Sequence, residues 1–153
     1  MSKVIEYYVV CDTREQKPLW EDKNIVRKKL DVGDYSILGL EDKIAIERKN
    51  CADAYGTFTA GMERFKKEME RAKDYDYFVI MIEGSFGKMI GKKFTNSKFI
   101  KVPGKTVMAT LNTLRVKYGV HVIFCQNRTE MKKEMTYIFQ AYLRWRLKDV
   151  RSK

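Results

Sequence analysis

The sequence is poor in cysteine, histidine and proline, with three, one and two residues respectively among 153. The cysteines, Cys11, Cys51 and Cys125, are scattered and form no C-x-x-C pair, and His121 is the only histidine. A disulfide framework and a zinc site built from cysteine and histidine are therefore both poorly supported.

Long apolar runs are also missing. The longest, from Tyr77 to Ile82, is far shorter than the roughly 20 residues that a membrane-spanning helix needs. The first residues, 1–6, lack the apolar segment of a secretory signal. We therefore expect an intracellular protein, in the cytoplasm or nucleoid of a prokaryote or phage host, or in the nucleus if the host is eukaryotic.

Acidic residues are absent from 84–129, which carries nine Lys or Arg, whereas 1–83 carries 17 acids and 15 bases. The whole chain has a net charge of +11. Such a cationic stretch is typical of a protein that binds a polyanion, with nucleic acid as the first candidate, because each neutralised phosphate releases counterions. The alternatives are a solvated basic surface and an anionic membrane. We expect no membrane partner, because no basic amphipathic helix with an exposed apolar face is evident.

The composition, 44% apolar and 33% charged, is that of a globular protein rather than a disordered one. Its length suits one domain, which we place at residues 1–150. Strand patterns occur at 4–11, 35–38, 43–47, 77–82 and 120–125, and helical patterns at 52–73, 107–118 and from 131 onward. This alternation predicts an α/β fold whose central sheet is covered by helices on both faces.

Two local features refine this prediction. Gly119 is expected to end the helix over 107–118, and Thr129 to cap the last helix. The segment 84–106 is rich in glycine and lysine and has no clear periodicity. We expect a mobile basic loop there, with room for a short helix inside it.

Acidic residues gather at three predicted strand ends within the first 53 residues. Asp12 and Glu15 follow the first strand, Asp34 precedes the second, and Glu47 ends the third. The second and third strands are joined by a turn at 41–42, so we expect them to form a hairpin.

That hairpin would bring two carboxylates together. If the end that carries Asp34 pairs with the end that carries Glu47, both groups converge beside Lys49. Side chains alternate along a strand, so Glu47 and Lys49 point one way and Arg48 the other.

Paired carboxylates beside a lysine suit metal-assisted hydrolysis of a phosphodiester. Carboxylate oxygens bind magnesium or manganese, and the metal lowers the pKa of its bound water. A lysine can orient that water or offset the developing charge. The pattern D-x(n)-E-x-K is weak by itself, because these residues occur at such spacings by chance. Ordinary solvated hairpin residues are the alternative.

A longer string is far more specific. It runs through residues 9–15, then Gly33-Asp34, then Glu47-Arg48-Lys49, and ends at Asp53. This string resembles the XPF family of structure-specific endonucleases, whose signature is G-D-x(n)-E-R-K-x-x-x-D. The resemblance continues through 79–84, 114–124 and 127–137, and so covers nearly the whole chain.

The resemblance implies a restriction-endonuclease-like nuclease core with a mixed sheet. Asp34 and Glu47 would hold magnesium or manganese, and Asp12 and Glu15 would complete the acidic site. Lys49 would assist the water or the phosphate.

Two further members of the signature, Arg48 and Asp53, would also be catalytic, but the residues themselves leave alternatives open. Arg48 binds an acid behind the site or reaches DNA beyond the strand. Asp53 is catalytic or lies in the first turn of a helix capped by Asn50, where an acid favours the helix dipole.

DNA contacts are expected from basic side chains: Arg14, Arg64, Lys88, Lys92, Lys93, Lys98, Lys101 and Lys105. Many members of the family carry helix-hairpin-helix modules after the nuclease core, and we expect a stand-alone form here, because the chain ends at Lys153. DNA would then be held by the basic surface of the core, with a protein partner or by a homodimer.

The predicted function is a metal-dependent, structure-specific DNA endonuclease. It would hydrolyse phosphodiester bonds near flap, fork or branched junctions, as in DNA repair and recombination. The alternatives are a non-catalytic DNA-binding partner subunit and a homodimeric four-way-junction resolvase.

Overall fold

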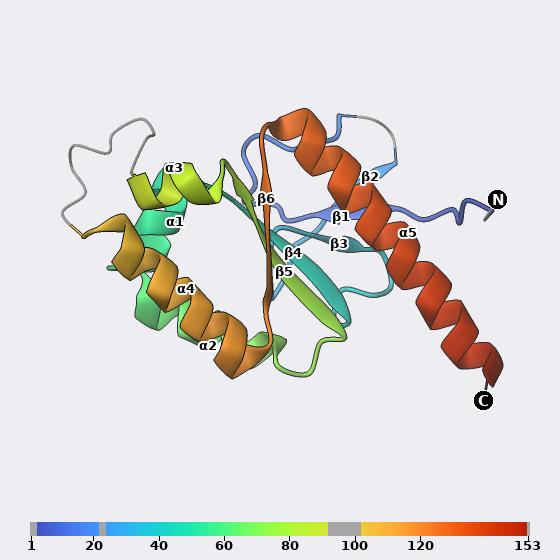
Figure 1. The fold of residues 1–153 in the computed structure, drawn as a ribbon. Helices are drawn as coiled ribbons and strands as arrows, with labels where there is room; N and C mark the ends of the chain where they lie inside the picture. Colours follow the sequence, from blue (N-terminus) through green and yellow to red (C-terminus); the bar gives the residue numbers. More distant parts are fainter. Residues whose placement is uncertain (1–2, 22–23, 92–101, 153) are drawn as a thin grey trace.

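The computed structural model describes residues 3–21, 24–91 and 102–152, with the side chains of the last helix described as far as Lys148. A six-stranded mixed sheet forms the centre, in the order β2-β1-β3-β4-β5-β6 (Figure 1). The strands are Val9–Cys11 (β1), Ile25–Arg27 (β2), Tyr35–Ile37 (β3), Ile44–Asn50 (β4), Tyr77–Glu83 (β5) and His121–Cys125 (β6).

Only β3 runs against its neighbours, whereas the other neighbouring pairs are parallel. The carboxyl ends of the five other strands therefore meet at one end of the sheet, together with the start of β3. We call this the carboxyl end of the sheet. Open α/β sheets commonly bind their ligands there.

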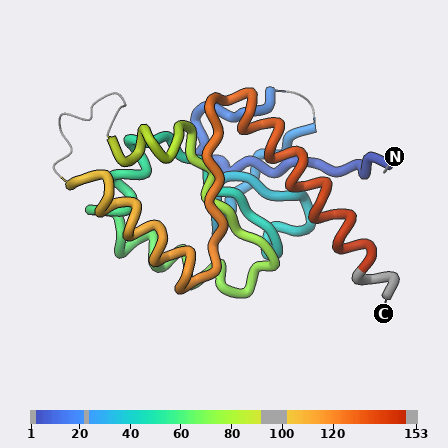
Figure 2. Tube along the Cα trace, viewed as in Figure 1, coloured from blue at the N-terminus to red at the C-terminus, as the bar shows by residue number. Residues whose placement is uncertain are grey.

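Helices cover both faces of the sheet, as the sequence predicted. They are Cys51–Thr57 (α1), Met62–Ala72 (α2), Phe86–Gly91 (α3), Gly104–Tyr118 (α4) and Arg128–Ser152 (α5). The first four gather on one side of the sheet, and α5, in red, lies alone on the other (Figures 1 and 2). The fold is therefore the mixed α/β type that was expected.

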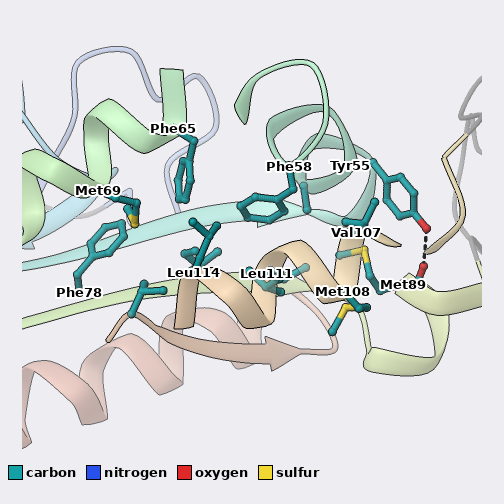
Figure 3. Close-up of a cluster of buried hydrophobic side chains, with 14 of the residues drawn as sticks. Tyr55, Phe58, Phe65, Met69, Phe78, Met89, Val107, Met108, Leu111 and Leu114 are labelled. Carbon is teal, nitrogen blue, oxygen red and sulfur yellow. Dashed lines mark hydrogen bonds between the residues drawn. The ribbon is translucent and has the colours of Figure 1, made fainter. Parts of the chain in front are cut away.

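Two apolar cores hold these layers together. Alternate residues of β4 and β5 face opposite ways: Ala45, Phe78, Ile80 and Ile82 toward α1–α4, and Ile44, Ile46, Val79 and Met81 toward α5. In the first core, side chains of α1, α2 and α4 interdigitate, and the Tyr55 hydroxyl donates to the Met89 carbonyl at 2.8 Å (Figure 3). Because both faces are covered, β5 is a continuous apolar run rather than an alternating one.

The prediction of one helix over 52–73 was wrong, because the chain breaks between α1 and α2. The Gly61 N–H donates to the Gly56 carbonyl at 2.8 Å, and the Thr59 hydroxyl donates to the Tyr55 carbonyl. A Cβ on Gly61 would lie only 3.2 Å from that Gly56 oxygen, so glycine lets the turn close. Threonine hydroxyls that bond to backbone carbonyls also compete with regular helix.

Three other boundaries differ from the predictions. The strand predicted over 4–11 is only β1, and β2 was missed because it is a short, partly exposed edge strand. The last helix is capped by Asn127, whose side chain accepts from the Glu130 N–H at 2.8 Å, rather than by Thr129, which lies in its first turn.

The basic segment 84–106 contains α3 and the first turn of α4. Its residues 92–101 lie outside the described part of the chain. Among the described residues, none of the helices has the length and apolar character needed to cross a membrane.

Gly119 ends α4 as predicted, with a left-handed φ of 67° and its N–H donating to the Arg115 carbonyl at 3.0 Å. A Cβ there would meet no atom within 4 Å, so only backbone strain opposes a side chain.

We expect Gly119→Ala to lower the free energy of unfolding by about 1–2 kcal/mol. Gly56→Ala is the matched control: Gly56 is inside α1 with equal room, so alanine should raise stability by about 0.5–1 kcal/mol. Urea unfolding of both variants tests this, and equal effects would contradict it.

Candidate active site

A cleft of about 650 Å³ opens at the carboxyl end of the sheet. It brings together every predicted catalytic residue and two of the predicted DNA-binding residues: Asp12, Arg14, Glu15, Asp34, Glu47, Arg48, Lys49, Asp53 and Arg64. These residues come from the β1–β2 loop, the β3–β4 hairpin, α1 and α2. The cleft is therefore assembled from segments that span the first 64 residues.

The centre of the cleft is the pair Asp34 and Glu47. β3 and β4 pair antiparallel, and the Asp34 N–H donates to the Ile46 carbonyl at 2.8 Å. The Arg48 N–H in turn donates to Oδ2 of Asp34 at 2.8 Å. The two carboxyl groups lie close enough for each to shift the pKa of the other. The convergence predicted from the hairpin is thus present.

Gly33 makes this approach possible. Its φ is +73°, a conformation that disfavours side chains, and a Cβ would lie 3.0 Å from the Ile46 carbonyl oxygen. A glycine directly before Asp34 thus serves both the turn and the close passage over β4.

Burial makes the two acids reluctant to ionise. The pKa of Glu47, which is only 7% exposed, is raised well above its usual range by burial and then by the charge of Asp34. Burial also raises the pKa of Asp34. Lys49 opposes both shifts, with Nζ 3.7 Å from Oε1 of Glu47. The pair is therefore a concentration of negative potential that a cation would relieve.

The donor set fits magnesium or manganese. Magnesium is commonly held by one or two carboxylates and completes its shell with water and phosphate oxygens. Within the part of the chain that the structure describes, no group of three or more Asp, Glu, His or Cys side chains could hold a metal ion. Asp34 and Glu47 would be the protein ligands, with the remaining positions left to water and substrate.

Asp12 is placed differently from these two acids. It is 2% exposed, and its oxygens accept from Nε of Arg14 at 2.7 Å and from the Leu30 N–H at 2.9 Å. Burial acts to raise the pKa of Asp12, but these bonds, that from Arg14 foremost, hold it below its usual value. Asp12 therefore orients the Arg14 guanidinium, 68% exposed, at the cleft.

Arg48 answers the question left open by the sequence. Its Nε and Nη2 bond to the two carboxylate oxygens of Glu15 at 3.1 and 3.0 Å. Arg48 also donates to the Lys17 carbonyl, to which Arg128 of α5 donates as well, whereas Lys49 pairs with Glu47, as side chains that alternate along β4 would. Arg48 binds an acid and ties the end of β4 to the β1–β2 loop.

Two arginines that the sequence analysis did not select hold the same loop. Arg27 donates through Nη2 to three carbonyls of residues 12–15 at 2.7–3.1 Å. Arg128, at the start of α5, donates to the carbonyls of Lys17 and Pro18 at 3.0 and 2.9 Å. The loop that carries Asp12 is therefore fixed by side chains from β2, β4 and α5.

The polar face of α2 forms another wall. Arg64, Glu68 and Arg71 follow at spacings of four and three, on the flank beside the apolar face. Glu68 was missed; its Oε1 accepts from the Gly33 N–H at 2.8 Å, and its charge raises the pKa of Glu47 further. The helical spacing from Arg64 was the signal that could have found it.

Asp53 has a clear structural position. Its N–H donates to Oδ1 of the N-cap Asn50 at 2.8 Å, and its exposed carboxylate lies in the first turn of α1 at the cleft wall.

Two of the other predicted DNA-binding lysines, Lys88 and Lys105, do not line the cleft. Lys88 lies on α3 and Lys105 in the first turn of α4. Lys92, Lys93, Lys98 and Lys101 lie outside the described residues.

Comparison with known proteins agrees with this geometry. The family model of the ERCC4 domain matches residues 11–138. Two solved structures of XPF from Aeropyrum pernix are similar, both at 19% identity. In the first, with a TM-score of 0.66, the match covers 88% of this chain and 61% of the XPF chain. In the second, which is in complex with DNA and has a TM-score of 0.63, the match covers 94% of this chain and 66% of the XPF chain. This likeness shows the fold, and the chain spans less than two thirds of those proteins. No curated protein sequence matches it.

The raised pKa of Glu47 predicts a stability cost. When folding raises the pKa of an acid, the free energy of unfolding of the protein falls as the pH rises from the unfolded pKa of that acid through its folded pKa. We therefore expect Glu47→Gln to raise the free energy of unfolding at pH 7.5, by about 1 kcal/mol. The gain should vanish near pH 4, where the unfolded chain is protonated too. Urea unfolding in EDTA at both pH values tests this; a variant less stable than wild type at pH 7.5 would count against it.

Proposed function

This chain belongs to the ERCC4 domain family, and we propose that it is a metal-dependent DNA endonuclease. It would hydrolyse phosphodiester bonds near the junction of duplex and single-stranded DNA, at flaps, forks or branched intermediates. The observation that carries the proposal is that Asp34 and Glu47 line the same open cleft, Asp34 bonded to the Arg48 N–H and Glu47 beside Lys49.

Magnesium or manganese would be held by Asp34 and Glu47. When bound, such an ion supplies a water of lowered pKa and positive charge for the phosphate. The remaining tasks fall to this chain's own side chains. Lys49, held by Glu47, would hydrogen-bond the attacking water or a phosphate oxygen. Arg14, which Asp12 and the Leu30 carbonyl orient, would bind a phosphate beside the scissile one.

DNA would be recognised through its backbone and shape. Cationic side chains line the cleft, among them Arg14, Arg64, Arg71 and Arg128, and phosphate contacts orient DNA without reading its sequence. The similar Aeropyrum pernix protein was solved in complex with DNA, which supports DNA as the substrate. Branched substrates would connect the protein with repair or recombination, inside the cell.

Two alternatives share the DNA partner. A non-catalytic partner subunit would bind DNA without cutting it, but the complete signature from Gly33 to Asp53 favours an enzyme. A homodimeric resolvase would place two symmetric cuts across a four-way junction. The test below separates these readings.

We expect metal-dependent cleavage of end-labelled flap, fork or four-way-junction DNA, and little cleavage of plain duplex. Asp34→Asn and Glu47→Gln should each lower the rate at least about 100-fold. Both should keep or improve DNA binding, because each removes negative charge from the cleft. The assay compares magnesium, manganese and EDTA, with binding measured in EDTA.

Glu63→Gln is the matched control. Glu63 lies on α2, its side chain is 87% exposed, and it does not line the cleft, so its loss should leave the rate unchanged. Full activity in Glu47→Gln would refute the proposed mechanism. Binding without cutting on every substrate would favour the partner subunit, and paired symmetric cuts would favour the resolvase.

A further inference from the structure

An exposed apolar pair lies on α3, outside the cleft. Phe86 is 56% exposed and Ile90 is 39% exposed. Four residues apart on a helix, they are neighbours on one flank. A phenyl ring that exposed forgoes much of the stabilisation that burial would give it.

The inner side of α3 is anchored in the core, and its outer side is open. Met89 is fully buried on the inner side, and Ser85 caps the helix by accepting from the Lys88 N–H at 3.1 Å. Gly87 lies on the outer side, where a Cβ would meet only the Ser85 hydroxyl, 3.9 Å away. The outer surface next to Phe86 is therefore bare backbone, which a ligand can approach closely.

Positive charge flanks the pair. Lys88 lies on the opposite flank of α3, near the start of α1, where its charge opposes the burial that raises the pKa of Cys51. Lys105 follows Gly104, whose backbone packs so tightly on α3 that a Cβ would collide with the Ile90 carbonyl oxygen. We call Phe86, Ile90, Lys88 and Lys105 the α3 platform.

The platform begins close to the cleft along the chain. Glu83, at the carboxyl end of β5, lines the cleft, and Phe86 follows three residues later, so the two lie within about 10 Å.

We propose that the α3 platform binds an unpaired DNA strand, with a base stacked on Phe86 and phosphates held by Lys88 and Lys105. Aromatic rings next to cationic side chains are how proteins hold single strands without reading sequence. In a duplex the base faces are already stacked, so an exposed ring gains this contact only with an unpaired strand. A protein partner fits less well, because lysines are depleted at protein interfaces.

This inference rests on the proposed function only for its place relative to the cut: the platform would hold the unpaired arm beside the cleft that holds the scissile phosphate. That arrangement would let the enzyme distinguish a fork or flap from plain duplex.

Binding of fluorescein-labelled oligo(dT) in EDTA, followed by anisotropy, tests the platform without cleavage. Phe86→Ala should weaken binding about fivefold to a hundredfold, and Phe86→Tyr should bind like wild type. Affinity for plain duplex should stay unchanged in both. Val116→Ala is the matched control, because Val116 is an 88% exposed apolar side chain near the far end of α4.

A second measurement detects stacking directly. The tryptophan of Phe86→Trp should lose fluorescence when oligo(dT) binds, whereas that of Val116→Trp should not. Unchanged oligo(dT) affinity in Phe86→Ala together with unquenched fluorescence in Phe86→Trp would overturn the inference. It would also be overturned if Phe86→Ala changed only the oligomeric state of the protein in solution, because the exposed face would then bind a second copy of the chain.

The two proposals fail separately. If the wild type cuts branched DNA but Phe86→Ala leaves oligo(dT) binding intact, the nuclease stands and the platform falls. If no substrate is cut but Phe86→Ala loses oligo(dT) binding, the platform stands as a single-strand site on a non-catalytic protein.

Discussion

The Asp34 N–H donates to the Ile46 carbonyl at 2.8 Å, and this bond sets the register in which β3 meets β4. Glu47 is the next residue, so the same register brings its carboxyl group against that of Asp34. A slip of one residue would turn Glu47 toward α5 and Arg48 toward α1, because side chains alternate along a strand. The acids, Lys49 and the Arg48–Glu15 pair all depend on this register.

Bringing two acids together in a buried place opposes folding, since burial raises the pKa of both and the charge of Asp34 raises that of Glu47 further. The rest of the sheet offsets this cost. β4 and β5 are buried on both faces, against α1–α4 on one side and α5 on the other. A pair of acids that lowers stability inside an otherwise well-packed domain is expected where residues are selected for function rather than for stability.

Different elements contribute different groups to the cleft at the carboxyl end of the sheet. Asp34 and Glu47 provide the negative centre, and arginines from β2, β4 and α5 hold the loop that bears Asp12. The α2 face supplies Arg64, and α3 begins at the same end. The proposed catalytic groups thus come from short segments of the first 53 residues, whereas the side chains that support them come from segments far apart in the sequence.

Local sequence was enough to predict the elements with strong periodicity, the end of α4 at Gly119 and the meeting of the signature residues from Gly33 to Asp53, because spacing along a strand or helix fixes which side chains share a face. It did not reveal the break between α1 and α2, the edge strand β2, or the parts played by Arg27, Glu68 and Arg128. Those were decided by tertiary structure. Arg128 reaches the carbonyl of Lys17 across 111 residues of sequence, and no local pattern records a contact that exists only once the sheet has brought both segments to the same end.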